Sequence, residues 1–255
     1  MGMIFLVGTQ LSGATWLRDC FSHVCKVPLG QELHLLELHE CISRHIKTYV
    51  HLNEDDARLA SRSVSQAAWR SLLDSAKVGA EFDKATYPAT SAHAIVRNDL
   101  HHRALGLARE VVPGAKTVVL IRDPRAVFNS TVRYLEKLQP GWGSKVDPIE
   151  FALTWQHQNT SWLNDSPTIY LKYEDLKMDF VATLSRVFSA CEISCSLETF
   201  STIVAREYAV DAVKSETRLA RVDDFAVRLK MSAIEQIEEG TADLMKFLNY
   251  RRLSS

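Results

Sequence analysis

Two short stretches of the sequence contain residue types that bind phosphate groups. Near the N-terminus, the run FLVGTQLSGATWL is an apolar segment followed by a glycine-flanked turn. Residues 8–15 fit the phosphate-loop pattern G-x-x-x-x-G-K-[ST] at every fixed position except one, where Ala14 replaces the lysine. The backbone N–H groups of such a turn, with the positive end of the following helix, bind anions. We therefore expect an anion site here, with the hydroxyls of Ser12 and Thr15 as additional donors.

A second anion-binding group is expected in the middle of the chain. The run KTVVLI, residues 116–121, is continuously β-branched or aliphatic and is followed by RDPR, in which the first arginine is Arg122; Ser130 follows on the next predicted helix. An arginine at the carboxyl end of a central strand points into the ligand crevice, and a nearby serine can bind the same oxyanion. The pattern favours a phosphate site at Arg122 and Ser130, although Arg122 alone could equally pair with a neighbouring carboxylate.

The missing lysine bears on the kind of nucleotide that is bound. A kinase or nucleotide hydrolase normally uses that lysine together with a metal-binding carboxylate on another strand. In this chain Ala14 takes the lysine position, and an arginine follows strand 116–121 where a Walker-B strand would end in aspartate. A P-loop kinase or nucleotide hydrolase is therefore a disfavoured alternative, and we expect no metal.

Strands and helices must position both motifs. The clearest predicted strands are residues 3–7, 116–121 and 168–173, and two shorter ones are expected at 78–82 and 93–96. The predicted helices are residues 15–24, most of 31–75, 99–112, 126–138, 148–163, 174–191 and 232–248. Strands that alternate with helices favour an α/β fold with a mostly parallel central sheet flanked by helices, in a single domain over residues 1–255.

Composition limits the partners. The 255 residues are 46% hydrophobic, which is enough for a sizeable core. Thirty basic and 31 acidic residues leave a net charge of -1, so no global field favours nucleic acid or an anionic membrane. No apolar run approaches the roughly 20 residues of a spanning helix, and five cysteines without zinc-finger spacing are typical of reduced thiols. We expect a cytoplasmic protein that binds neither nucleic acid nor membrane.

In their order along the chain, the motifs resemble those of the sulfotransferases that use 3'-phosphoadenosine 5'-phosphosulfate (PAPS). The first turn is similar to the family's 5'-phosphosulfate loop, G-x-x-[RK]-S-G-T-[TS]-x-L, and LIRDPRAVFNS resembles its 3'-phosphate motif, R-D-P-R-x-x-x-x-S. YLKYEDLKMD resembles the family's Y-E-D-L segment, whose tyrosine, here Tyr173, lies near the adenine. The resemblance implies a P-loop-like α/β fold, PAPS as donor, and a small-molecule acceptor with a hydroxyl or amino group.

The resemblance also implies further cofactor contacts. Trp16 lies where cytosolic members stack a tryptophan on the adenine. Lys214, Arg218 and Arg221 lie where the family has a mobile basic loop over the 3'-phosphate, and an ordinary exposed loop would explain them equally well. The residues expected to bind the cofactor are Thr9, Gln10, Leu11, Ser12, Gly13, Ala14, Thr15, Trp16, Arg122, Ser130, Tyr173, Lys214, Arg218 and Arg221.

Candidates for the general base come from the same resemblance. The family's base lies before the helix that leads to PGAK, which in this chain is the segment RNDLHH at 97–102. His101 falls at the histidine of the family's K-x-P-x-H, and Asp99 falls at that of K-T-H. Asp83 is a third candidate, because FDKATY resembles the family's E-K-S-x-x-Y. Each could instead be a helix cap or a surface residue.

One departure from the family concerns a cation of the loop. The family has lysine or arginine before the Ser-Gly pair, where this chain has Leu11. That cation stabilises the negative charge that grows on the bridging oxygen as the sulfuryl group leaves. We expect Lys84 or Arg97 to supply it and therefore to be catalytic; the alternative is a degenerate member that binds nucleotide without turnover.

The acceptor pocket is expected in the variable segments, roughly residues 30–90 and 139–165. Trp142, Trp155 and Trp162 are candidates to line a flat apolar pocket there, with core packing as the competing explanation.

Overall fold

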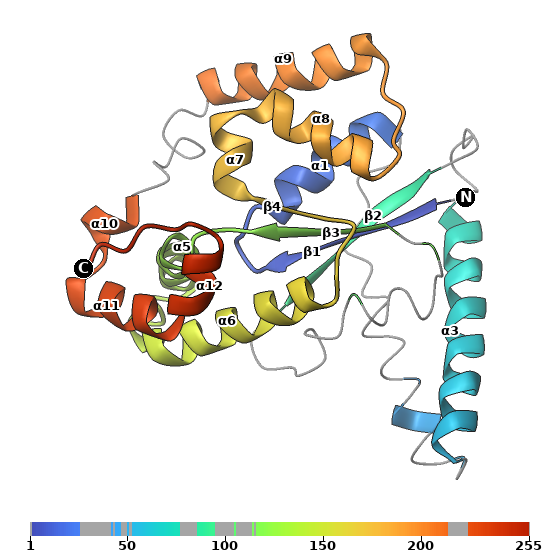
Figure 1. The fold of residues 1–255 in the computed structure, drawn as a ribbon, viewed down its shortest axis with the longest axis horizontal. Coiled ribbons are helices and arrows are strands. Elements are labelled where there is room, and N and C mark those ends of the chain that lie inside the picture. Colours follow the sequence, from blue (N-terminus) through green and yellow to red (C-terminus); the bar gives the residue numbers. More distant parts are fainter. Residues whose placement is uncertain are drawn as a thin grey trace.

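The computed structural model describes residues 2–25, 53–76, 86–94, 116–213 and 224–254, with a few single positions between them. Its strands form a four-stranded sheet in the order β2-β1-β3-β4. These strands are β1 (Gly2–Thr9), β2 (Thr86–Ala94), β3 (Lys116–Ile121) and β4 (Ile169–Lys172). Every pairing is parallel. The predicted α/β fold with a parallel central sheet is therefore confirmed (Figure 1).

The two inner strands, β1 and β3, owe their position to their apolar sequences. Residues 117–121 of β3 and residues 4–7 of β1 are all buried, as expected for a strand that is covered on both faces. Their register pairs Val7 with Val119 and Gly8 with Leu120. Because all strands run in parallel, the segments that follow β1, β3 and β4 leave the sheet at one edge, where ligands bind in open α/β sheets.

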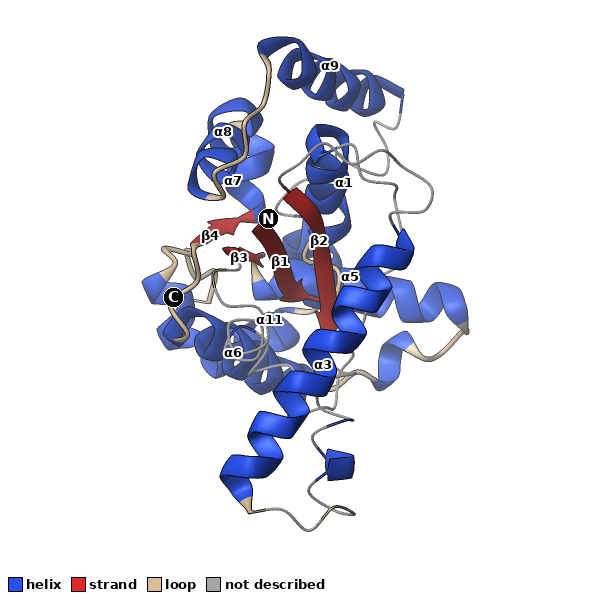
Figure 2. Ribbon diagram, turned by 90° about the vertical axis from the view of Figure 1, so that its right-hand side faces the viewer, coloured by secondary structure: helices blue, strands red, loops and turns tan. Residues whose placement is uncertain are grey.

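Helices lie on both sides of the sheet, as Figures 1 and 2 show. One side holds α1 (Ala14–Cys25), α7 (Tyr173–Met178), α8 (Phe180–Ala190) and α9 (Leu197–Val213). The opposite side holds α6 (Pro148–Asn164) and α11 (Met231–Gly240), which pack on each other, and α6 also contacts β1 and β3. The remaining elements are α3 (Glu54–Ala76), α5 (Pro124–Leu138), η3 (Gly143–Lys145), α10 (Asp224–Arg228) and α12 (Ala242–Phe247). None of the helices in the described ranges has both the length and the apolar character needed to cross a bilayer.

A core cluster fills the space between the sheet and the helices α1 and α8. It includes Ile4 and Leu6 of β1, Leu17 and Phe21 of α1, and Leu184 of α8, all at most 1% exposed. Burying a side chain of this size stabilises the fold by about 1.5–3 kcal/mol. The cluster therefore fixes α1, and with it the turn that precedes α1, against the end of β1.

Two predicted helices are divided in the structure. The segment 174–191 was expected as one helix but forms α7 and α8, because the side chain of Asp179 accepts a hydrogen bond from Ala182 N (3.1 Å) and caps a new helix. The segment 232–248 divides at Thr241 into α11 and α12. Helix α9 was not predicted.

The strand predictions before β3 were less accurate. Strand β2 spans residues 86–94, so the strand expected at 93–96 overlaps only its last two residues. The strand expected at 78–82 and most of the helix expected at 99–112 lie outside the described residues.

Candidate functional site

The turn between β1 and α1, residues 8–15, is called the glycine loop below. Ser12 N donates to Thr9 O (3.0 Å), and Trp16 N and Leu17 N donate to Gly13 O (3.0 and 3.3 Å). Both Leu11 (φ 64°) and Gly13 (φ 96°) have left-handed backbone conformations. For a leucine this conformation is unfavourable, and such residues are concentrated at functional sites. The loop therefore has the tight geometry expected of a phosphate loop.

Both glycines of the loop are needed for close packing. A Cβ on Gly8 would lie 2.6 Å from Ser12 Oγ and 2.8 Å from Leu120 O of β3. A Cβ on Gly13 would lie 2.5 Å from Cδ2 of Tyr173, in addition to the strain of its positive φ. The loop thus lies directly against β3 and the Tyr173 ring.

Two hydroxyl groups of this region have free hydrogen-bonding capacity. Thr9 Oγ1 and Ser12 Oγ are buried and have no hydrogen-bond partner in the described part of the chain. Buried polar groups normally have partners, so such a group in a native structure needs an explanation. A bound oxyanion at the start of α1 would supply one for Ser12. The loop residues therefore fit an anionic group.

Arg122 joins the second predicted anion site to the glycine loop. Its Nη1 donates to Leu11 O (2.9 Å) and to Ser130 Oγ (3.4 Å). The guanidinium lies over the ring of Tyr173, 4.6 Å from its centroid, a cation–π contact. The structure thus brings Arg122, Ser130, Tyr173 and the glycine loop together.

Aromatic side chains continue from Tyr173 away from Arg122. Trp16 meets Tyr173 edge to face (5.7 Å between centroids) and stacks on Phe180 (5.5 Å). Lys177 Nζ lies over the Trp16 ring at 4.9 Å. Lys177 and Phe180 were not predicted as site residues, although they follow Tyr173 by four and seven residues, a spacing that would place all three on one face of a helix.

Directly after Arg122 in the chain, a buried ion network fixes the start of α5. Arg125 donates through Nη2 to Asp123 Oδ2 (2.6 Å) and through Nη1 to Glu238 Oε1 (2.5 Å), and the three side chains are at most 6% exposed. Burial alone would lower the pKa of Arg125, but its hydrogen bonds and attraction to Asp123 and Glu238 raise it. Burial alone would raise the pKa of Glu238, but hydrogen bonds from Ser254, Leu253 N and Arg125 lower it. No local sequence pattern predicts this network.

A third buried carboxylate, that of Glu174, holds the backbone beside Arg122. Glu174 accepts from Asp123 N (3.0 Å) and from the Tyr250 hydroxyl (2.7 Å). Burial raises the pKa of Glu174 despite these hydrogen bonds. Burial and the nearby Glu174 charge also raise the pKa of Tyr250 well above its ordinary value. The Y-E-D-L segment therefore positions the Arg122 strand end as well as contributing Tyr173.

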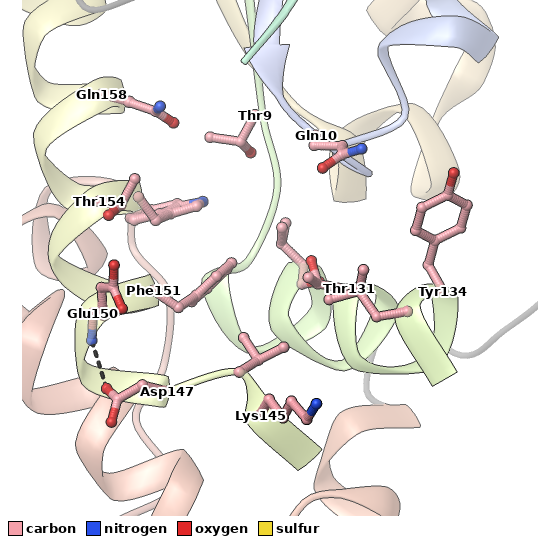
Figure 3. Close-up of a pocket in the computed structure, with 14 residues that line it drawn as sticks. Thr9, Gln10, Thr131, Tyr134, Lys145, Asp147, Glu150, Phe151, Thr154 and Gln158 are labelled. Carbon is pink, nitrogen blue, oxygen red and sulfur yellow. Dashed lines mark hydrogen bonds between the residues drawn. The ribbon is translucent and has the colours of Figure 1, made fainter. Parts of the chain in front are cut away.

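A cavity of about 400 Å³ opens next to the glycine loop, between α5 and α6 (Figure 3). Thr9 and Gln10 of the loop line one end of it. Of the three tryptophans predicted to line an acceptor pocket, Trp155 lines this cavity. Trp162 is buried in the core, and Trp142 is 41% exposed.

Several predicted site residues lie outside the described residues. These are the catalytic candidates Asp83, Lys84, Arg97, Asp99 and His101 and the basic-loop residues Lys214, Arg218 and Arg221. The side chain of Thr15 is also not described. Within the described ranges, no group of three or more His, Cys, Asp and Glu side chains is placed to hold a metal ion.

Comparisons with solved structures agree with this fold. The sulfotransferase domain of the Synechococcus PCC 7002 olefin synthase superposes with a TM-score of 0.55 at 16% identity, covering 98% of this chain and 95% of that one. The sulfotransferase domain from the curacin biosynthetic pathway gives 0.53 at 19% identity, covering 78% and 76%. Sulfotransferase STF9 from Mycobacterium avium gives 0.51 at 13% identity, covering 96% and 76%. At these identities the likeness establishes the fold alone.

A comparison at the level of sequence families is more specific. No curated protein sequence matches the chain. The family model described as "Sulfotransferase family" matches residues 3–196, which include the glycine loop, Arg122, Ser130 and Tyr173. The chain therefore belongs to the sulfotransferase family.

Proposed function

We propose that this protein transfers a sulfuryl group from PAPS to a hydroxyl or amino group of a small-molecule acceptor. In this reaction the S–O bond between the sulfuryl group and the 5'-phosphate of PAPS breaks, a bond from sulfur to the acceptor oxygen or nitrogen forms, and the acceptor's proton passes to a base. The proposal includes a single domain over residues 1–255 and a cytoplasmic location.

One observation carries the proposal: the glycine loop and the pair Arg122–Ser130 lie together at one edge of the sheet, with the rings of Tyr173 and Trp16 beside them. The glycine loop would hold the 5'-phosphosulfate through its backbone N–H groups and Ser12. Arg122 and Ser130, which are in contact with each other, would hold the 3'-phosphate. Trp16 and Tyr173, which also touch, would lie beside the adenine. A nucleotide with anionic groups at both its 3' and 5' positions matches this arrangement.

The first test replaces Arg122. Because a hydrogen bond to a charged group contributes about 1.5–3 kcal/mol, Arg122→Ala should weaken binding of 3'-phosphoadenosine 5'-phosphate (PAP) by about 10- to 150-fold. Binding of adenosine 5'-phosphosulfate, which lacks the 3'-phosphate, should change much less. Calorimetric titration of both nucleotides measures the difference. Arg186→Ala is a matched control, because Arg186 is 58% exposed on α8. Equal losses for the two nucleotides would contradict the assignment of Arg122.

The second test concerns the base. A positioned general base contributes about 10²–10⁴-fold to rate, so His101→Ala or Asp99→Ala should lower turnover about 100-fold or more. PAP affinity should stay nearly unchanged, because the loss arises in the transition state. Initial rates with PAPS and a phenolic acceptor check this, with His102→Ala as the neighbouring control. Full activity in both variants would leave Asp83 as the candidate for the general base, or would mean that the reaction uses no dedicated base.

A P-loop kinase or hydrolase is distinguished by its ligand. Such a protein would bind a magnesium–triphosphate complex in preference to PAP. A nucleotide-binding member without turnover would bind PAP but yield no sulfated product from any acceptor. Calorimetry with both ligands, followed by product analysis, separates these alternatives from the proposed reaction.

A further inference from the structure

The cavity between α5 and α6 is large enough to hold a small molecule. Its volume of about 400 Å³ lies within the usual range for ligand sites. It adjoins Thr9 and Gln10, at the edge where β1 passes into the glycine loop. Figure 3 shows the side chains of α5 and α6 facing each other across this space, with the loop residues between them.

The described inner wall of the cavity carries no charged side chain. Val127 and Trp155 are each 1% exposed, and the other partly or fully buried lining residues are uncharged as well. The charged lining residues, Lys145, Asp147 and Glu150, are all exposed. Asp147 is in addition engaged as the cap of α6, where it accepts from Ile149 N and Glu150 N (both 2.8 Å). A charged ligand group inside would therefore find no buried counter-ion among the described residues, and burying an unpaired charge is costly.

Two buried polar atoms without a hydrogen-bond partner in the described part of the chain belong to residues that line the cavity. They are Trp155 Nε1 and Thr9 Oγ1. Their residues are 1% and 5% exposed, and both line the cavity. Gln158, which is 7% exposed, extends toward Thr9 across the same end (Figure 3). An indole N–H can only donate, so its missing partner is an acceptor atom.

We propose that this cavity binds the acceptor, and that the acceptor is an uncharged, mainly apolar hydroxy compound. Its oxygen accepts a hydrogen bond from Trp155 Nε1 at the end formed by Thr9, beside the glycine loop. The apolar body fills the space between Val127 and Phe151. The word "acceptor" rests on the proposed sulfuryl transfer, whereas the binding site and the ligand class rest on the cavity alone.

The first experiment measures ligand binding without turnover, by equilibrium dialysis in the presence of PAP. The probes are 2-naphthol and its charged analogue 6-hydroxy-2-naphthoate. The neutral compound should bind at least 10-fold more tightly to the wild-type protein. Thr154→Phe places a ring in the cavity and should weaken 2-naphthol binding at least 10-fold. Leu153→Phe is the matched control on the same helix, because Leu153 is 57% exposed and does not line the cavity.

The second experiment tests the hydrogen bond. Trp155→Phe should reduce the preference for 2-naphthol over 2-methylnaphthalene at least fivefold, because only the naphthol oxygen can accept from the indole. A general loss of packing would weaken both ligands and leave their ratio unchanged. Trp142→Phe, which alters an exposed tryptophan, should have no effect on either ligand.

The outcomes separate this inference from the proposed function. Absence of 2-naphthol binding, equal binding of the charged analogue, equal effects of Thr154→Phe and Leu153→Phe, or an unchanged ligand ratio in Trp155→Phe would overturn the inference. PAP titration of the same variants should give wild-type affinity. If the expected binding pattern is found but PAPS yields no sulfated naphthol, the proposed function fails and the assignment of the cavity survives.

Discussion

Replacing Arg125 by methionine is expected to lower the free energy of unfolding by about 3–5 kcal/mol, the usual cost of removing one partner from a buried ion pair. The change leaves the carboxylates of Asp123 and Glu238 buried without the guanidinium that now bonds to both. Urea denaturation at pH 7 measures the loss. Arg133→Met is the matched control on the same helix, because the Arg133 side chain is 55% exposed and its pair with Asp224 should contribute at most about 1 kcal/mol.

The loss of unfolding free energy in Arg125→Met, relative to the wild-type protein, should become smaller as the pH falls. In the wild-type protein the folded-state pKa of Glu238 lies below its ordinary value, so this group stabilises the fold above its unfolded pKa and loses that contribution as the pH drops through the folded pKa. In the variant the hydrogen bond from Arg125 that helps to lower this pKa is gone, and protonation of Glu238 relieves a buried charge that keeps Arg252 but has lost Arg125 as an ion-pair partner. A deficit that stays constant from pH 7 to pH 4, or one no larger than that of Arg133→Met, would contradict a stabilising role of the network.

The elements that build the site could be predicted where local signals were strong. The run KTVVLI was assigned to β3 with its observed bounds, because a continuous apolar run between polar segments has few other solutions. The division of residues 174–191 at Asp179 was missed because the apolar periodicity continues through it, and only the capping geometry reveals the break. Asp is a common N-cap, so Asp179 was the available signal.

The site itself could be predicted only in part. Arg122 and Ser130 lie eight residues apart, a spacing that brings two residues together where a helix follows a strand, and the structure has a hydrogen bond between them. Their binding of a phosphate stays a prediction. The bond from Arg125 to Glu238 joins residues 113 positions apart, and no local pattern predicts such a pair. The wall of the cavity likewise depends on how α5 and α6 pack. The roles of the catalytic candidates at 83–101 stay predictions.

The loop cation remains the feature in which this chain departs most from its family. The backbone carbonyl of Leu11 accepts a hydrogen bond from Arg122, but the leucine side chain cannot stabilise negative charge on the leaving oxygen. Losing such a donor typically costs about 10²–10³-fold in rate. If Lys84 or Arg97 supplies the charge instead, Lys84→Ala or Arg97→Ala should lower sulfuryl transfer by about that factor while PAP still binds.

Leu11→Lys, made in the background of whichever alanine variant is impaired, should then restore part of the activity. The substitution adds no backbone strain, because leucine and lysine are both unbranched at Cβ and meet the same cost at φ 64°. Leu11→Met is the matched control: it keeps the length and apolar character of the side chain, so it should restore nothing. Rates of PAPS-dependent transfer to one phenolic acceptor, measured with PAP affinities, give the comparison. If instead the wild-type protein shows no transfer and Leu11→Lys alone gains it, no residue has replaced the cation, and the natural protein binds the nucleotide without turnover.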